Sequence, residues 1–415
     1  MEQVTAAKSA GPFNRLARPV YGFALRKIMS MASRELSAGR LDVTLPNGQN
    51  FTADSGAPGP HAKVHFRDMR AIWMITTAGD LGFAEAYMAG MFDTPELKDV
   101  LDLTVANEAF FQGLMSNRGL AGWLANRLHA SRDNSKQGSK ENIYAHYDLG
   151  NTFYGSWLDE SMTYSSAVYS PDATSSNQSL VEAQHAKYAR IAQIGGFTPD
   201  SHVLEIGCGW GGFAEYAAKH VGCKVTGVTI SQAQYEFAAQ RMQREGLNEK
   251  VELRIQDYRD IEPEGFNGVA SIEMFEAVGE KHWPGFFGQV NRVLKPGGRA
   301  SMQIITIADD LFEHYRNGVD FIQKYIFPGG MLPSVAKLTE LSDEAGLRLE
   351  QNDGFALDYS RTLLEWNERF QKVWPEIRGG KFDEPFRRMW EYYLKYCATG
   401  FESGRIDVRQ LAWAK

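Results

Sequence analysis

The stretch Val203-Leu204-Glu205-Ile206-Gly207-Cys208-Gly209-Trp210-Gly211-Gly212 lies near the middle of the chain and decides the fold. Its first four residues are mostly apolar and predict a short buried strand, and the glycines after them predict a sharp turn that begins a helix. Glycine suits such a turn because the backbone can bend sharply and bring its N–H groups close to a ligand without a Cβ in the way.

The glycine pattern G-x-G-x-x-G does not by itself identify the ligand, because dinucleotide sites, S-adenosylmethionine sites and plain tight turns all contain it. A nicotinamide site needs an acidic residue at the end of the next strand, to bind the ribose hydroxyls. That strand runs from Val225 to Ser231 and has no carboxylate. An acidic residue, Glu205, instead stands two positions before Gly207. This order, with Lys295-Pro296-Gly297-Gly298 ahead of a later strand, resembles class I S-adenosylmethionine-dependent methyltransferases.

Short apolar runs alternate with helical segments on the C-terminal side of the glycine turn. This alternation predicts an α/β fold with a parallel, Rossmann-like sheet whose ligands bind at the carboxyl ends of the strands. Two long aromatic helices and a short closing strand follow. The expected strands are 203–206, 224–230, 251–257, 268–275, 299–307 and 407–412, and the expected helices are 213–219, 231–245, 283–294, 362–377 and 385–399.

Length and composition bound the remaining possibilities. A chain of 415 residues predicts more than one domain. Residues 131–140 contain no apolar side chain and predict a linker, which leaves a smaller α+β domain at 1–130 and a catalytic domain at 141–415. The net charge of −7 argues against a nucleic-acid partner. The three cysteines have neither disulfide nor metal-ligand spacing, and no membrane-spanning run or signal peptide is evident, which predicts a cytoplasmic protein.

The segment Phe13–Leu36 has a basic amphipathic pattern that Pro19 interrupts, and residues 1–40 carry a net charge of +5. One interpretation is an interfacial helix on anionic lipid at the inner face of a membrane. The alternative is a helix that packs on its own domain with a solvated basic face. A lipid substrate would favour the first interpretation.

Motifs spread over residues 141–415 occur in the order and spacing of the cyclopropane-fatty-acyl-phospholipid synthases, and the chain resembles that family. The N-terminal domain resembles it more loosely, through Phe83-Ala84-Glu85-Ala86-Tyr87-Met88-Ala89-Gly90. The matching motifs are His146-Tyr147-Asp148-Leu149-Gly150-Asn151, Met162-Thr163-Tyr164-Ser165, the glycine turn, Gly227-Val228-Thr229-Ile230-Ser231, Gln256-Asp257-Tyr258-Arg259-Asp260, Met274-Phe275-Glu276, Lys324-Tyr325-Ile326-Phe327-Pro328-Gly329-Gly330 and Trp390-Glu391-Tyr392-Tyr393-Leu394.

The resemblance implies S-adenosyl-L-methionine as cofactor and an unsaturated acyl chain of a bilayer phospholipid as substrate. It places the methionine part of the cofactor at the glycine turn, the ribose beside the next strand and the adenine beside the strand after that. Aromatic rings are expected to stabilise cationic character on the acyl chain, and the candidates are Tyr164, Phe275, Tyr325 and Tyr359. The residues implied to bind the cofactor are Tyr164, Ser165, Glu205, Gly207, Gly209, Gly211, Thr229, Ser231, Gln234, Asp257 and Tyr258.

In the family, a bound bicarbonate removes a proton from the added methyl group, held by a glutamate, a tyrosine, a cysteine and a histidine. The resemblance places the glutamate at Glu276 and the tyrosine at Tyr359, whereas the cysteine and histidine positions hold Ser166 and Gln303. These two departures put the bicarbonate site in doubt more than the methyl transfer. Without a base over the new methyl group, the product would be methyl-branched or methylenic instead of a ring.

Two other interpretations stay open at this point. Plant alkaloid N-methyltransferases look similar in the catalytic domain, so a small-molecule amine is an alternative substrate, although the N-terminal domain counts against it. A lipid-binding or cofactor-sensing module without catalysis is the other. The sequence leaves the oligomeric state open, a homo-oligomer included.

Overall fold

The computed structural model describes residues 28–115, 149–170 and 178–415, and these fall into two compact units. Unit 1 holds residues 28–115, 319–321 and 378–399, and unit 2 holds the remaining described residues. The predicted linker at 131–140 lies outside the described residues, as do His146, Tyr147 and Asp148.

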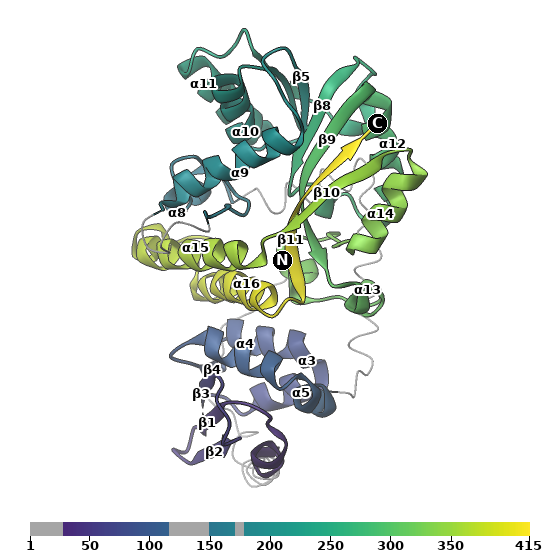
Figure 1. Ribbon diagram of the computed structural model, residues 1–415. Coiled ribbons are helices and arrows are strands. Elements are labelled where there is room, and N and C mark those ends of the chain that lie inside the picture. The colour runs from purple at the N-terminus through teal and green to yellow at the C-terminus, as the bar shows by residue number, and fades with distance from the viewer. Residues whose placement is uncertain (1–27, 116–148, 171–177) are drawn as a thin grey trace. The chain divides into compact units, whose positions relative to one another are not determined.

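Unit 2 is built on a seven-stranded sheet, which Figure 1 shows with β8, β9 and β11 as neighbours. The strand order is β10-β11-β9-β8-β5-β6-β7. The strands from β7 to β9 pair in parallel, whereas β11 pairs antiparallel with both β9 and β10. The strands are β5 (His202–Ile206), β6 (Lys224–Thr229), β7 (Val251–Ile255), β8 (Phe266–Ile272), β9 (Leu294–Ile307), β10 (Arg348–Gly354) and β11 (Ile406–Ala414).

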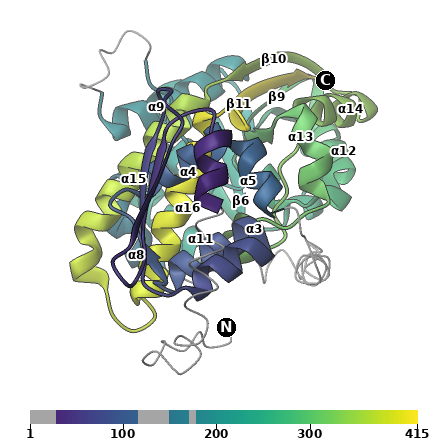
Figure 2. The ribbon, with the colours of Figure 1, turned by 90° about the horizontal axis from the view of Figure 1, so that it is seen from below.

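Helices cover both faces of this sheet. Side chains alternate across each strand, so Val203 joins one hydrophobic cluster and Leu204 joins the other. The Val203 cluster includes side chains of α9 (Leu180–Ile194), α10 (Gly212–Tyr216) and α11 (Gln232–Arg244). The Leu204 cluster includes side chains of α12 (Trp283–Val293) and α14 (Val335–Glu344), which lie next to one another in Figures 1 and 2.

Shorter and peripheral elements complete unit 2. The helix α8 packs against α15. The described part of the chain contains no helix with the length and apolarity needed to span a bilayer. The remaining elements are α8 (Asn151–Trp157), α13 (Asp309–Arg316), α15 (Ala356–Ile377), the π-helices η1 (Ala217–Val221) and η5 (Ile322–Ile326), and the 3-10 helices η2 (Tyr258–Asp260), η3 (Phe275–Ala277) and η4 (Glu280–His282).

The structure confirms the predicted α/β class with its Rossmann-like sheet and extra helices, and it corrects two details. The sheet is mixed rather than wholly parallel, because the closing strand β11 runs antiparallel between β9 and β10. The strand β10 was not predicted. Its sequence Arg-Leu-Glu-Gln-Asn-Asp-Gly has a single large apolar residue, since it lies at the edge of the sheet and is largely exposed.

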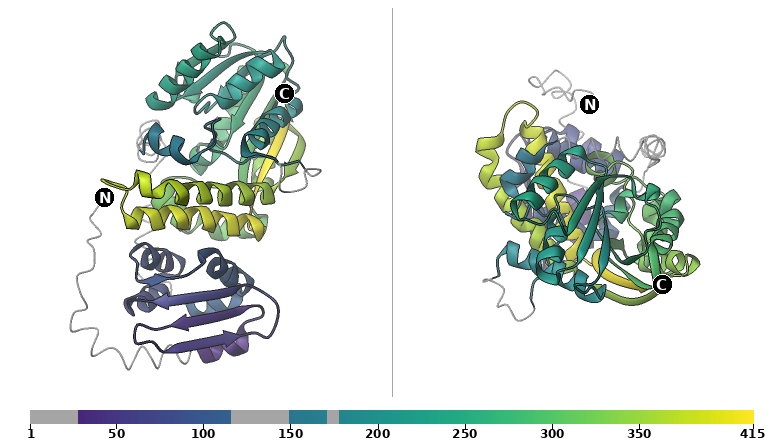
Figure 3. Two further views of the ribbon diagram at one scale, coloured as in Figure 1. Left: turned by 90° about the vertical axis from the view of Figure 1, so that its left-hand side faces the viewer. Right: turned by 90° about the horizontal axis from the view of Figure 1, so that it is seen from above.

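Unit 1 combines a four-stranded sheet with helices, as the left view of Figure 3 shows. The strand order is β2-β1-β3-β4, and the hairpin between β1 and β2 turns at Gly48, where φ is 81°. The helix α4 packs against β3. The elements are β1 (Arg40–Thr44), β2 (Asn50–Asp54), β3 (His61–Phe66), α3 (Arg70–Met88), β4 (Phe92–Asp93), α4 (Leu97–Ala106) and α5 (Glu108–Met115).

The described end of the amphipathic segment packs on its own unit. Residues 28–35 are helical, and Met29, Ala32 and Leu36 are buried in the core of unit 1, whereas Arg34 is exposed. This part therefore follows the alternative interpretation of a packed helix with a solvated basic face. Residues 13–27 lie outside the described residues.

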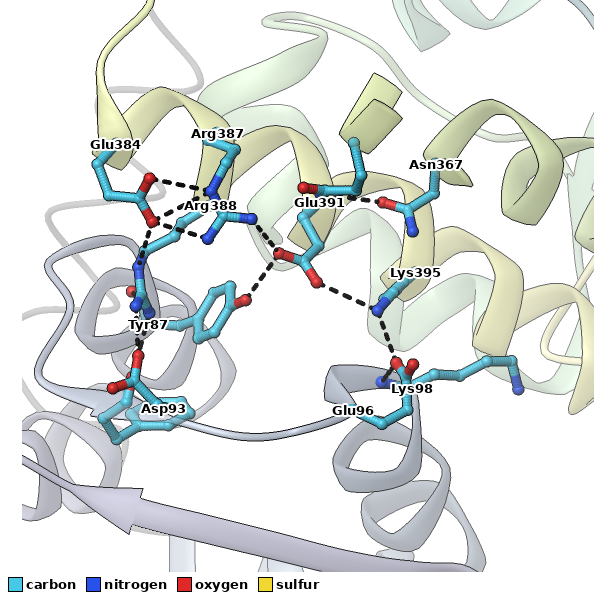
Figure 4. Close-up of polar contacts among 12 residues, drawn as sticks. Tyr87, Asp93, Glu96, Lys98, Asn367, Glu384, Arg387, Arg388, Glu391 and Lys395 are labelled. Carbon is cyan, nitrogen blue, oxygen red and sulfur yellow. Dashed lines mark hydrogen bonds and ion pairs between the residues drawn. The ribbon is translucent and has the colours of Figure 1, made fainter. Parts of the chain in front are cut away.

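Most of α16 (Glu384–Glu402) belongs to unit 1, and a network of ion pairs fixes it there (Figure 4). Arg388, only 8% exposed, donates to the carbonyl oxygens of Tyr87 and Phe92, both at 3.2 Å, and pairs with Asp93. Glu391 accepts a hydrogen bond of 3.0 Å from the Tyr87 hydroxyl. The guanidinium gives both buried carbonyls a side-chain donor, and the Tyr87 carbonyl also accepts from the Gly90 N–H at 2.9 Å.

We expect Arg388→Ala to destabilise unit 1 by about 1–3 kcal/mol, because it removes the hydrogen bonds to the Tyr87 and Phe92 carbonyls and one of the two arginines that pair with the partly exposed Asp93. Thermal unfolding measures the loss, and hydrogen exchange of α3 and β4 amides locates it. The matched control is Arg70→Ala, whose guanidinium is 60% exposed beside Asp68 and should matter far less. Equal melting temperatures for the two variants would contradict the role given to Arg388.

Candidate active site

The residues predicted to bind the cofactor lie in unit 2 at the carboxyl ends of neighbouring parallel strands. Gly207 follows β5, Thr229 ends β6 and Asp257 follows β7. Because β6 pairs in parallel with both β5 and β7, these ends meet at one edge of the sheet. The structure therefore brings together the three parts of the site that the sequence predicted separately.

The glycine turn has the left-handed backbone that its sequence predicted. Gly207, Gly209 and Gly211 have φ values of 82°, 51° and 82°. A Cβ on Gly207 would lie 2.6 Å from Cγ of Met274, whereas a Cβ on Gly209 would meet no protein atom within 4 Å. Turn geometry explains both glycines, and Gly209 in addition leaves open space above the backbone, as close approach of a ligand requires.

The predicted ribose side forms one hydrogen-bonded group. The Thr229 hydroxyl donates to Oε1 of Gln234 at 3.0 Å, and the Ser231 N–H donates to the Thr229 hydroxyl oxygen at 3.1 Å. Ser231 is the N-cap of α11, and its hydroxyl accepts from the Gln234 N–H. All three residues are buried, so Gln234 is not a helix-surface amide.

On the predicted adenine side, Asp257 forms an ion pair with Arg259 at 2.6 Å and caps the short helix η2. Burial raises the pKa of the neighbouring Tyr258 hydroxyl to about 12, which keeps it protonated near neutral pH. The ion pair holds the Asp257 side chain in a fixed orientation. Asp257 and Tyr258 thus have defined places at the carboxyl end of β7.

Tyr164 joins a cluster of aromatic rings in unit 2. Its ring centroid lies 5.3 Å from that of Trp366, 5.2 Å from Tyr154 and 5.8 Å from Trp157. Tyr359 meets Trp366 edge-on at 6.2 Å, so this cluster holds two of the four predicted aromatic residues. The third, Phe275, is 1% exposed and packs into the core beneath the sheet.

The fourth aromatic candidate, Tyr325, lies in η5, where Nζ of Lys324 stands 5.1 Å from the centre of its ring. The ammonium group of Lys324 therefore already makes the cation–π contact with this ring that a cationic acyl chain would need.

A buried lysine, Lys187, contacts the predicted cofactor residue Ser165, and the sequence analysis did not predict it. Nζ of Lys187 donates to the Ser165 hydroxyl and to Oε1 of Gln184, both at 2.6 Å. Burial lowers the pKa of Lys187 to about 7, although the nearby carboxyl groups of Glu273 and Glu205 oppose the shift. Burial also raises the pKa of Glu205 to about 8.

Three of the four predicted catalytic residues converge on a carboxyl group that was not predicted, that of Glu273. Its Oε1 accepts from the Ser166 backbone N–H at 2.8 Å and from Nε2 of Gln303 at 2.7 Å. Its Oε2 accepts from the Tyr359 hydroxyl at 2.5 Å. The Ser166 hydroxyl donates instead to the carbonyl of Ala167. Ser166, Gln303 and Tyr359 thus form one site around Glu273.

The amide of Gln303 is oriented by its neighbour in the sheet. Gln303 and Gln410 are register partners on β9 and β11, and Nε2 of Gln410 donates to Oε1 of Gln303 at 3.0 Å. This leaves Nε2 of Gln303 to donate to Glu273 and to the Ser166 carbonyl. The hydrogen-bond network therefore assigns which end of the amide faces the carboxyl group.

Glu273 directly follows β8 and has a φ of 49°, one of two non-glycine residues with positive φ among those described. Such a backbone costs on the order of 1–2 kcal/mol in a non-glycine residue. Its N–H donates to the Gln303 carbonyl at 2.8 Å, which holds the strained turn. The available sequence signal was an acidic residue at the end of the buried run Gly268–Ile272, three positions before Glu276.

Glu276, the fourth predicted catalytic residue, stands beside this group without joining its hydrogen bonds. Its Oε1 accepts from the Ile305 N–H at 2.5 Å, and its Oε2 is buried with no partner among the described residues. Burial, together with the charge of Glu273, raises its pKa to about 8. Glu276 is therefore protonated near neutral pH.

Taken together, the strand order, the left-handed glycine turn and the polar residues at the strand ends define a class I methyltransferase site that fits S-adenosylmethionine. Comparison with known proteins identifies its family. A family model described as mycolic acid cyclopropane synthetase matches residues 134–411. The chain belongs to this family, and it is an S-adenosylmethionine-dependent methyltransferase.

Individual relatives extend the comparison. The chain is 36% identical to the tuberculostearic acid methyltransferase UfaA1 of Mycobacterium tuberculosis, over 86% of this chain and 84% of that protein. It is 37% identical to the cyclopropane-fatty-acyl-phospholipid synthase of Escherichia coli, over 81% and 84% of the two chains.

The solved structure of the cyclopropane synthase MmaA2 from M. tuberculosis is 28% identical to this chain. It has a TM-score of 0.61 and covers 66% of this chain and 98% of its own. The structure of CmaA1 with bound S-adenosylhomocysteine has the same TM-score at 27% identity, over 66% of this chain and 98% of its own. These findings confirm the family that the sequence motifs indicated.

We expect Gly209→Ala to weaken S-adenosylhomocysteine binding by at least about tenfold, or about 1.4 kcal/mol, while the protein stays folded. Its Cβ would meet no protein atom but would enter the space that the ligand needs. The matched control is Gly246→Ala, which has a φ of 67° and equally open surroundings but follows α11 on the surface. Calorimetry measures both affinities, and equal affinities would place the cofactor elsewhere.

The raised pKa of Glu276 predicts a pH dependence of stability. The unfolded chain releases this proton near pH 4.5 and the folded chain near pH 8, so the group stabilises the fold at low pH and the contribution disappears as pH rises through that window. Glu276→Gln has no such proton, so its melting temperature should fall less than that of the wild type between pH 5 and pH 8. The exposed Glu249→Gln variant should behave like the wild type.

Proposed function

We propose that the protein transfers a methyl group from S-adenosylmethionine to a double bond of an unsaturated fatty-acyl chain in a membrane phospholipid. The observation that carries the proposal is the convergence of Ser166, Gln303 and Tyr359 on one carboxyl group in the same unit as the cofactor site. Relatives of more than 35% identity named for fatty-acyl products support the choice of substrate.

The residues have distinct roles in this reaction. Bound at the glycine turn, S-adenosylmethionine supplies an electrophilic methyl group. The turn would hold its methionine part, Thr229 and Gln234 its ribose side, and Asp257 with Tyr258 its adenine. Tyr164 and Tyr359 present aromatic faces, which can stabilise positive charge on the acyl chain without reacting with it. The product then depends on where the cation loses its proton.

Cyclopropane formation is the outcome that follows from the family and from the Escherichia coli relative. A second outcome, a methyl-branched or methylenic chain without ring closure, is favoured by two residues of this chain. Ser166 and Gln303 stand where the cyclopropane synthases have cysteine and histidine, and the relative named for tuberculostearic acid is a methyltransferase by name. In both outcomes the acyl chain gains one carbon.

A phospholipid substrate requires the protein to approach a bilayer, and we propose that it does so from the cytoplasmic side. The positive charge of residues 1–40 would favour anionic headgroups and supports peripheral binding at the inner face of the membrane.

Expression in a bacterial host that lacks such an enzyme tests the function. We expect unsaturated phospholipids to gain a mass of about 14 Da, one CH₂. Proton NMR of the extracted lipids separates the outcomes, because cyclopropane protons resonate upfield and methylene protons in the vinyl region. The matched control is Gly209→Ala, which should reduce the product in proportion to its cofactor affinity. An unchanged lipid profile, with the protein folded and cofactor bound, would contradict an acyl substrate.

A further inference from the structure

The anion site that the family resemblance predicts is filled by a carboxyl group of the chain, that of Glu273. The family resemblance predicted a bicarbonate held at Ser166, Gln303, Tyr359 and Glu276. In the structure, donors from the first three of these residues point at the carboxyl group of Glu273, at 2.5–2.8 Å. A carboxylate and a bicarbonate share the same planar pair of acceptor oxygens, so each can satisfy this set of donors.

A bicarbonate does not fit beside this carboxylate. The donors that would hold it are already used by Glu273, and the fourth predicted residue, the protonated Glu276, could offer at most the single O–H of its carboxyl group. Two adjacent anions would also repel each other in a site of low dielectric. The structure therefore disagrees with an exchangeable bicarbonate in this chain.

Burial raises the pKa of the Glu273 carboxyl group, and its surroundings oppose that shift. The hydrogen bonds from Tyr359 and Gln303 and the positive charge of Lys187 all favour the ionised form. The amide of Gln303 is turned toward the carboxyl group by Gln410. The residue as a whole is partly exposed. Its Oε2 accepts a single hydrogen bond among the described residues, which leaves one lone pair available.

We infer that the Glu273 carboxylate replaces bicarbonate as the base that takes a proton from the methyl group added to the acyl chain. In this step the C–H bond of that methyl group breaks and the proton moves to Oε2 of Glu273. The electron pair closes the C–C bond of a ring. Where a hydride first shifts from the methyl-bearing carbon to the neighbouring cationic carbon, the pair instead forms a C=C bond to the former methyl carbon, and in both cases the carbocation is neutralised without any oxidant or reductant. Gln303, Gln410 and the Ser166 N–H are positioning groups. The inference rests on the proposed acyl substrate.

The test compares turnover of the full-length protein on vesicles of unsaturated phospholipid in carbonate-free buffer and after bicarbonate is added. The wild type should turn over equally in both. Glu273→Gly removes the side chain, suits the positive φ and leaves the donors facing an empty space. It should lose at least about 100-fold in carbonate-free buffer, the scale of general-base catalysis, and recover when bicarbonate is added. Glu273→Gln should lose as much and stay inactive, because its amide fills that space.

The matched control is Glu391→Gln in unit 1, where a glutamate also accepts a tyrosine hydroxyl, at 3.0 Å. It should keep wild-type turnover and the same indifference to bicarbonate. S-adenosylhomocysteine affinity, measured for every variant, shows that the cofactor site is intact. Full turnover of Glu273→Gln would overturn the inference, and so would a wild type that requires bicarbonate.

Binding of ¹³C-labelled bicarbonate, followed by NMR, gives a readout that does not depend on the substrate. Glu273→Gly should bind the anion and the wild type should not. If the wild type methylates no lipid, the proposed function fails, and this comparison still decides whether Glu273 fills the anion site. Bicarbonate binding to the wild type with the same affinity as to Glu273→Gly would overturn the inference on its own.

Discussion

Parallel pairing of the central strands is the constraint on which the site depends. Because β5, β6, β7, β8 and β9 run in one direction, the residues that follow several of them meet at a single edge. The register then decides which side chains meet. Ile272, the last residue of β8, pairs with Gln303 on β9, so the next residue, Glu273, lies within reach of the Gln303 amide. Gln410 is aligned with Gln303 from the other side by the antiparallel pairing of β11.

Electrostatics explain why these groups occur together. A carboxylate within the protein loses its hydration and is stable only when donors and a counter-charge replace the water. Glu273 has three donors and the charge of Lys187 nearby. Glu276 has a single donor, and its pKa rises to about 8. Burial raises the pKa of both carboxyl groups, but only Glu273 has several donors and a lysine that oppose the shift. The two environments therefore differ in how strongly they favour the ionised form, which is the kind of difference by which active sites separate acid from base.

The sequence predicted most of what depends on local pattern. The glycine turn and the five parallel strands follow from hydrophobic periodicity and turn chemistry. Phe275, an aromatic candidate for the substrate site, is 1% exposed and packs in the hydrophobic core of unit 2. The strand β10 carries little apolar pattern, and nothing local in residues 378–399 indicates that Arg388 packs against Tyr87.

Glu273 shows why sequence reasoning did not complete the site. Its role depends on the register between β8 and β9 and on a positive φ. Neither feature can be recognised from the identity of a single residue. Glu276 lies in a motif that the chain shares with the family, so the family resemblance favoured Glu276 as the catalytic glutamate over Glu273, three residues earlier. The sequence gives no signal for buried polar partners such as Lys187 and Gln410 either, because a helical lysine or a strand glutamine is ordinarily a surface residue.

A base built into the chain differs physically from an exchangeable anion. A bicarbonate must be captured from solution and loses translational freedom at each binding event, whereas a tethered carboxylate is present at a high effective concentration in a fixed direction. The positive φ at Glu273 costs the folded chain on the order of 1–2 kcal/mol, and this cost arises once, when the protein folds. A carboxylate held at one point can reach fewer positions than a diffusible anion. The proton it removes is therefore set by the geometry of β8, and with it the choice between closing a ring and leaving a branch.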